Sequence, residues 1–150
     1  MVSQYDLNDI LCAVREGKRT EAHALIAHFI ENKSDLKTDW LKVSVLALRI
    51  GDTNLAAQAA DLFHRSCPKN AETDIQYAGL YAEIGDLDKA LQVVTPYIVR
   101  KVALPSVYHL AGTVQAQQGK LREARLNLLQ ALALAPQLGI SWYTLASIVD

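Results

Sequence analysis

The sequence predicts an all-α protein, built as a solenoid of four helical hairpins followed by one additional helix. Two observations in one register lead to this prediction. Glycines recur at steps of 34 residues, at Gly17, Gly51, Gly85 and Gly119. Alanines recur at the same step, at Ala22, Ala56, Ala90 and Ala124. A period of this length is typical of stacked helix–turn–helix units, in which a glycine closes the first helix of each unit.

A third observation comes from the stretch between Leu121 and Pro136, where apolar residues follow helical spacing. Three- and four-residue steps separate Leu121, Ala124, Leu128, Ala131 and Leu132. Such spacing puts these side chains on one face of an α-helix. Gly119 ends the preceding helix and Pro136 ends this one. Each unit should therefore hold two helices, one on each side of its glycine.

The repeat divides the chain into units over residues 3–36, 37–70, 71–104 and 105–138, with a partial fifth unit over 139–150. We expect these units to form a single array over residues 1–150. In the first unit, Asp6 and Asp9 stand where large residues are expected, which fits a first helix with a polar outer face. In the third unit, Pro96 predicts a kink or an early helix end near Thr95. Pro105 stands where it can begin the next helix.

The last predicted helix, Gly139 to Asp150, is more apolar than a terminal helix usually is, since it carries Ile140, Trp142, Tyr143 and Val149. We therefore expect these residues to be the amino-terminal part of a longer chain. The alternative is a homodimer, in which a second copy covers the helix Gly139 to Asp150.

These patterns resemble the tetratricopeptide repeat, a family of 34-residue helical hairpins with the pattern W-x₂-L-G-x₂-Y, then A-x₃-F, then P. The fourth unit matches it at Tyr108, Ala111, Gly112, Gly119, Ala124, Leu128, Ala131 and Pro136. The second unit matches it at Trp40, Val43, Gly51, Ala56 and Pro68. The resemblance covers essentially the whole chain. It implies a right-handed α-solenoid whose first helices line a concave groove.

Small residues stand at the eighth and twentieth places of the units, as Gly112 and Ala124 do in the fourth unit. Side chains of this size let the two helices of a hairpin approach each other closely. A larger residue at Ala124 should overpack this crossing.

Composition excludes several classes of function. Hydrophobic residues make up 51% of the chain, charged residues 21%, and the formal net charge is −1, which is typical of a folded, soluble protein. No cluster of basic residues exceeds Arg15 to Arg19, so we expect no nucleic-acid partner. No signal sequence or apolar run long enough for a bilayer is present, so we expect no membrane partner. Cys12 and Cys67 are too few for a disulfide framework, which predicts reduced, packed thiols and a cytoplasmic location.

No constellation for catalysis or metal binding is evident in the sequence. His23 and His28 are five residues apart and do not share a helix face, while His64 and His109 lie in different units. Motifs for zinc, phosphate or nucleophile chemistry do not occur. We therefore predict no enzyme, no cofactor and no metal in these residues, and favour a non-catalytic scaffold for protein–protein interaction. The alternative is a substrate-positioning array of a larger enzyme, similar to a sulfotransferase or glycosyltransferase, whose catalytic domain follows Asp150.

The resemblance also implies which residues face the groove and bind a protein or peptide partner. These candidates are Leu7, Leu11, Arg15, Leu41, Lys42, Val45, Leu48, Arg49, Ile75, Gln76, His109 and Thr113. The first half of the groove is aliphatic with a basic edge, so an apolar peptide with acidic flanks would fit it. An open aliphatic floor of this size should need a cover. The alternative is that curvature, or the segment Met1 to Tyr5, already buries it.

Relatives that bind the acidic carboxyl-terminal tails of chaperones hold them with a clamp of Lys, Asn and Arg residues. The five matching places in this chain hold Leu7, Leu11, Lys42, Glu72 and Gln76. Only Lys42 keeps a positive charge, so we do not expect recognition of that kind of tail.

Overall fold

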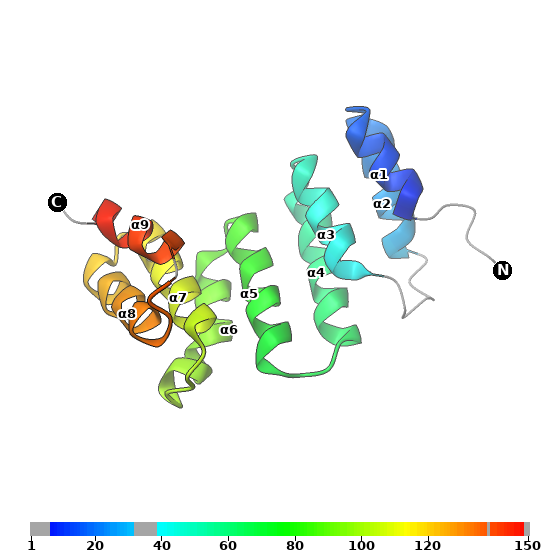
Figure 1. Ribbon diagram of the computed structural model, residues 1–150. Helices are drawn as coiled ribbons and strands as arrows, with labels where there is room; N and C mark the ends of the chain where they lie inside the picture. The colour runs from blue at the N-terminus through cyan, green and yellow to red at the C-terminus, as the bar shows by residue number, and fades with distance from the viewer. Residues whose placement is uncertain (1–6, 32–38, 138, 149–150) are drawn as a thin grey trace. The chain divides into compact units, whose positions relative to one another are not determined.

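The computed structural model describes residues 7–31, 39–137 and 139–148 of the chain. In these residues all regular structure is α-helical: there are nine helices and no strand (Figure 1). The chain forms two compact units, Met1–Pro68 and Lys69–Asp150. The predicted all-α class is confirmed.

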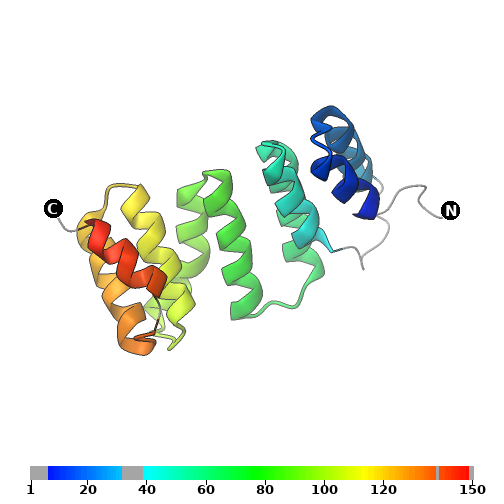
Figure 2. The same cartoon turned by 45° about the horizontal axis from the view of Figure 1, so that its top comes forward.

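The first unit holds two hairpins, whose four helices are α1 (Leu7–Arg15), α2 (Arg19–Glu31), α3 (Trp40–Arg49) and α4 (Thr53–Ser66). Helices α1 and α2 pack together, and so do α3 and α4. Helix α1 also contacts α3, and α2 contacts both α3 and α4. The first helices of the two hairpins therefore lie side by side, as do the second helices (Figures 1 and 2).

The second unit holds two further hairpins and a final helix, namely α5 (Ala71–Ile84), α6 (Leu87–Val99), α7 (Pro105–Gln117), α8 (Leu121–Leu134) and α9 (Gly139–Ile148). Helix α7 contacts both helices of the hairpin before it, and α9 contacts both α7 and α8 in the same way. Helix α9 therefore packs like the first helix of a further hairpin.

The repeated glycines close the first helix of every hairpin. Their φ angles are all positive: 72° at Gly17, 79° at Gly51, 105° at Gly85 and 82° at Gly119. A side chain is disfavoured in this left-handed conformation, which glycine adopts without penalty. In each turn the residue after the glycine donates its backbone N–H to the carbonyl five residues earlier, at 2.9–3.0 Å. This bond satisfies a carbonyl at the helix end, and the predicted role of the glycines is confirmed.

Two of these turns also begin the next helix with an aspartate. The Asp52 carboxylate accepts a hydrogen bond from the Leu55 N–H at 3.1 Å, and Asp86 accepts one from Lys89 N–H at 3.1 Å. An aspartate at this position satisfies a backbone donor that has no partner inside the helix. In these two turns the glycine ends one helix and the following aspartate caps the next.

The close helix crossings predicted from small residues are also present. Ala22, Ala56, Ala90 and Ala124 are all completely buried. A methyl group placed on Gly112 would lie 2.7 Å from Leu128 Cγ and 3.1 Å from the Ala124 carbonyl oxygen. In the second hairpin the eighth place holds Ser44, whose hydroxyl donates to the Ala56 carbonyl at 2.8 Å. At these crossings, between α3 and α4 and between α7 and α8, the two helices of the hairpin approach so closely that only small side chains fit between them.

Three local expectations are wrong. Helix α6 does not end early near Thr95 but continues to Val99, and the Arg100 N–H donates to the Pro96 carbonyl at 3.1 Å. A kink near Thr95 stays a prediction. Proline has no N–H to donate to the carbonyl four residues earlier, at Gln92. Both Gln92 and Pro96 are exposed, so water can reach that carbonyl.

Leu121 is 48% exposed and lies outside the buried face of its helix. Cys12 is an exposed thiol on the polar side of α1, not a packed one, while Cys67 is half-buried. Pro105 begins α7 as predicted.

Candidate functional site

We define the inner face of each unit as the side of its first helices that points away from the second helices. Helix α3 shows the division clearly. Its buried side carries Trp40, Val43, Ser44, Leu46 and Ala47. The opposite side carries Leu41, Lys42, Val45, Leu48 and Arg49, all of which remain at least partly accessible. Because side chains three and four residues apart share a helix face, Leu41, Val45 and Leu48 form one stripe.

The first unit brings eight of the candidate residues together on α1 and α3. Five aliphatic side chains are half-buried: Leu7, Leu11, Leu41, Val45 and Leu48. Helices α1 and α3 contact each other, and all five of these side chains are partly covered. These five side chains therefore form a partly covered aliphatic strip, and not the fully open aliphatic surface that the sequence led us to expect. The segment Met1 to Tyr5, which we considered as a cover, lies outside the described residues.

Three exposed cations border this aliphatic strip: Arg15 on α1, and Lys42 and Arg49 on α3. None of them forms an ion pair with a carboxylate within the part of the chain that the structure describes. An exposed cation without a protein partner attracts anionic groups from solution, most strongly at low ionic strength. The inner face of the first unit therefore combines apolar contact with positive charge.

The second unit holds the remaining four candidates on α5 and α7, which contact each other. Ile75, His109 and Thr113 are half-buried, and Gln76 is exposed. The Thr113 hydroxyl donates to the His109 carbonyl at 2.8 Å. Burial lowers the pKa of the His109 imidazole below its ordinary value of 6.5, because a poorly solvated site disfavours the charged form. This part of the inner face is thus polar and neutral at physiological pH.

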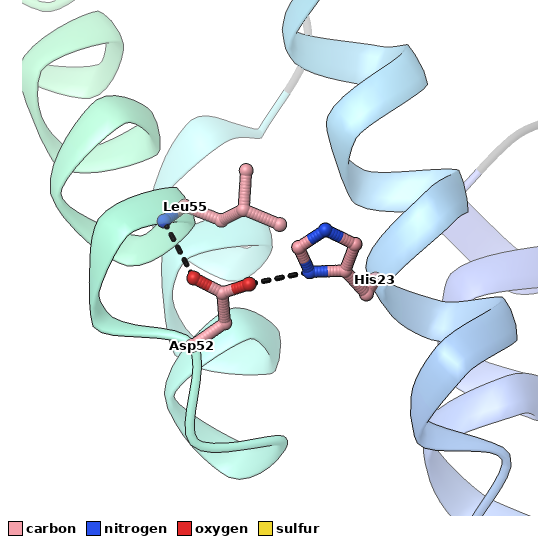
Figure 3. Close-up of polar contacts among 3 residues, drawn as sticks. All are labelled: His23, Asp52 and Leu55. Atoms are coloured by element: carbon pink, nitrogen blue, oxygen red, sulfur yellow. Dashed lines mark hydrogen bonds and ion pairs between the residues drawn. The ribbon is translucent and has the colours of Figure 1, made fainter.

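A polar contact joins the two hairpins of the first unit away from the inner face. Asp52, which caps α4, also lies 2.5 Å from His23 Nδ1 on α2 through its second carboxylate oxygen (Figure 3). One carboxylate therefore orders the start of α4 and links it to the preceding hairpin. Both side chains therefore have a structural role at this contact.

The described residues contain no group of three or more His, Cys, Asp and Glu side chains that could hold a metal ion. A pocket between α1 and α2 is lined by Asp9, Cys12, Ala13, Glu16, Glu21 and Leu25. Neither a histidine nor a lysine is among these lining residues, so no base of this kind stands beside the Cys12 thiol in this pocket. Of the helices in the described ranges, none has both the length and the apolar character needed to cross a bilayer.

Among the described residues, the most exposed large apolar side chains lie outside the set of groove candidates. They are Val99, Leu121, Leu126, Leu129, Leu134 and Trp142. Four of the six belong to α8. Leu126 and Leu129 could have been found from the sequence, because the equivalent places of the third unit, 34 residues earlier, hold the polar residues Gln92 and Thr95.

Stacked two-helix units of this length, each closed by a glycine and crossed at small residues, define a tetratricopeptide-type fold. Solved structures agree. The first TPR domain of human RPAP3 is 16% identical with a TM-score of 0.60, over 73% of this chain and 86% of that one. The second TPR domain of human RPAP3, in complex with the HSP70 peptide SGPTIEEVD, is 20% identical with a TM-score of 0.58, over 71% and 89%.

A bacterial structure matches over more of the chain. MamA (41-end) from Desulfovibrio magneticus RS-1 is 17% identical with a TM-score of 0.64, covering 94% of this chain and 80% of that one. No protein-family model matches the sequence, and no curated protein gives a significant match. The structural likeness therefore establishes a tetratricopeptide-type fold.

Proposed function

We propose that this protein is a non-catalytic scaffold that binds a peptide or partner segment on its inner face. The observation that carries the proposal is the surface of α3. There the half-buried stripe of Leu41 and Val45 lies beside Lys42 and Arg49, two cations without an ion-pair partner among the described residues. A partner segment with aliphatic and acidic residues would gain both apolar contact and charge complementarity there.

The spacing of the two cations supports recognition of an extended acidic segment. Lys42 and Arg49 are seven residues apart, which corresponds to about 10 Å along the helix axis. They can therefore contact two separate carboxylates, one at each end of the aliphatic stripe. Arg15 on α1 adds a third cation to the same face. The inner face of the second unit, taken by itself, offers a mainly polar surface at Ile75, Gln76, His109 and Thr113.

The comparison with RPAP3 supports peptide binding as a mode but not the same ligand. Its second TPR domain was solved with an HSP70 peptide that ends in acidic residues. At the five places that resemble the chaperone-tail clamp, this chain has two leucines, a glutamate, a glutamine and only one cation, Lys42. We therefore propose a partner segment that is more apolar, with carboxylates at its flanks. That residues 1–150 act as a single array stays a prediction, as does their fusion to an enzyme.

A pull-down with the double variant Leu41→Glu plus Val45→Glu tests the proposal. Two carboxylates in the aliphatic stripe should abolish partner capture, and Lys42→Glu plus Arg49→Glu should weaken it with a reduced salt dependence. Gln58→Glu on the exposed side of α4 is the matched control and should leave capture unchanged. Undiminished capture by a Leu41→Glu plus Val45→Glu protein with wild-type helicity would reject the inner face as the site.

A second candidate function is self-association through α9, and exposure of one tryptophan favours it. Trp142 is 54% exposed, whereas Trp40 and Tyr108, at the same place of earlier units, are 3% and 5% exposed. In those units a second helix, α4 or α8, packs against the helix that carries the aromatic residue, whereas no second helix follows α9 within the described residues. A second copy could supply a cover for Trp142. Sedimentation velocity should then show a dimer that Trp142→Ser dissociates, and a monomer at all concentrations would exclude it.

A further inference from the structure

A separate apolar patch lies on α8, on the side that faces away from its own hairpin. Leu126 and Leu129 are 64% and 46% exposed. They are one helical turn apart, so their side chains share a face, and the exposed Ala133 continues that face by another turn. We call Leu126, Leu129 and Ala133 the outer patch. It lies on a second helix and is therefore distinct from the inner face.

Stacking of another hairpin would not cover the outer patch. The places equivalent to Leu126 and Leu129 in α6 hold Gln92 and Thr95. A complete hairpin, α7 and α8, follows α6 in the same unit, yet Gln92 and Thr95 remain exposed. These places therefore stay on the surface of the repeat even when the next unit is present. Burial inside a repeat array cannot explain why leucines occupy them in α8.

Two arginines accompany the leucines. Arg122 precedes Leu126 by four residues and Arg125 precedes Leu129 by four, so each arginine lies one turn from a leucine. Both arginines are exposed, and neither forms an ion pair with a described carboxylate. Glu123, which stands between them in sequence, is also exposed, so the two arginines and this glutamate leave a net charge of +1 at the amino-terminal end of the patch, with apolar surface beyond it. Its charge complement is an acidic, amphipathic segment.

We propose that the outer patch docks an acidic amphipathic helix of a protein partner. Aliphatic side chains of that helix cover Leu126 and Leu129, and its carboxylates pair with Arg122 and Arg125. A partner helix that lies along α8 presents its aliphatic side chains and its carboxylates one turn apart, which matches the spacing of the leucines and arginines. Helices commonly dock on apolar surfaces in this way. Arginine can bind a carboxylate through two hydrogen bonds and so fixes the orientation of the docked helix.

Charge argues against a second copy of α8 as the occupant. An antiparallel copy centred on Leu126 and Leu129 would bring the two copies of Arg125 to about 8 Å from each other along the axis. Neither copy supplies a carboxylate for these arginines at the centre of the contact. The like charges would repel, whereas an acidic helix removes the repulsion and adds ion pairs.

The test uses two synthetic helical peptides labelled with a fluorophore. Both carry leucines at three- and four-residue steps. The first has glutamates one turn from the leucines, and the second has lysines in their place. Fluorescence anisotropy should show binding of the glutamate peptide and at least tenfold weaker binding of the lysine peptide. The variant Leu126→Gln plus Leu129→Thr, which copies the residues of α6, should weaken binding of the glutamate peptide at least tenfold.

Charge reversal and matched controls complete the design. Arg122→Glu plus Arg125→Glu should exchange the preference and favour the lysine peptide. Gln92→Ala plus Thr95→Ala should change neither affinity, and Leu41→Glu plus Val45→Glu should leave peptide binding intact, which separates this proposal from inner-face recognition. The proposal is overturned if Leu126→Gln plus Leu129→Thr binds the glutamate peptide as wild type does.

Three other outcomes would also overturn the proposal. The first is no binding of the glutamate peptide to the wild-type protein. The second is tighter binding to vesicles of phosphatidylserine and phosphatidylcholine that depends on the same leucines, which would indicate a membrane surface. The third is a concentration-dependent dimer that Leu126→Gln plus Leu129→Thr abolishes, which would indicate a second copy.

Discussion

Replacement of Gly112 by alanine should destabilise the second unit, although alanine is the better helix former. A methyl group at this position would lie 2.7 Å from Leu128 Cγ, 2.9 Å from Leu128 Cδ2 and 3.1 Å from the Ala124 carbonyl oxygen. Leu128 is completely buried and cannot move away without displacing its neighbours. The carbonyl belongs to the backbone of α8 and cannot yield by a change of rotamer.

Two effects of opposite sign set the magnitude. In a helix interior, alanine is favoured over glycine by about 1 kcal/mol. Overpacking of a close-packed core costs roughly 1–3 kcal/mol and more where backbone must shift. Because the Gly112 contacts include backbone as well as a buried side chain, we expect the steric cost to exceed the gain. The free energy of unfolding should fall by about 1–2 kcal/mol.

Gly79 on α5 supplies a matched control in the same unit, since a methyl group there would meet no atom within 4 Å. Gly79→Ala should therefore raise the free energy of unfolding by about 0.5–1 kcal/mol. Urea unfolding followed by circular dichroism measures both changes, and each kcal/mol corresponds to roughly 4–8 °C in Tm for a unit of this size. If Gly112→Ala is as stable as Gly79→Ala, the close crossing of α7 and α8 does not exist in solution.

Substitutions at three further positions test other features. Lys101, after the end of α6, has a φ of 54°, a backbone conformation that disfavours residues other than glycine. In urea unfolding, Lys101→Gly should therefore raise the free energy of unfolding of the second unit by about 0.5–1 kcal/mol. A lower free energy of unfolding would contradict backbone strain at this residue. Asp52→Ala removes the cap of α4 and should cost about 1 kcal/mol, while Asp52→Asn, which keeps a capping oxygen, should cost less; equal losses would argue against capping. The pKa of His109 lies lower in the folded protein than its ordinary value of 6.5, so the unfolded chain binds more protons and stability should fall as pH decreases below about 6.5. His109→Gln should remove this part of the pH dependence of the free energy of unfolding. A variant whose stability follows the same pH profile as the wild type would refute the prediction.

The hairpins could be predicted from the sequence because their turns depend on single residues. A glycine such as Gly51 allows the left-handed end of a helix, and the following Asp52 starts the next one. The closeness of the helices could also be predicted, because only a small residue such as Gly112 fits at the crossing. Both features are local or lie within one hairpin, so the repeat pattern shows them directly.

Exposure could not be predicted as well, since it depends on neighbouring hairpins. Helical spacing places Val45 on the inner side of α3, but it does not predict that the side chain is half-buried, in a helix that also contacts α1. Leu121 shares the apolar spacing of α8 and is nevertheless exposed. The rule that proline ends a helix failed at Pro96, where a solvent-facing position in the last turn tolerates the lost hydrogen bond.

Site-specific photo-crosslinking would test recognition by the inner face most directly. A photoreactive residue is placed at Lys42 or Arg49 on α3, or at Gln58 or Arg65 on the exposed side of α4, and the crosslinked partner is quantified. Partner adducts should form from the two α3 positions and be almost absent from the two α4 positions. Adducts of equal yield from both helices, or from α4 alone, would contradict binding on the inner face.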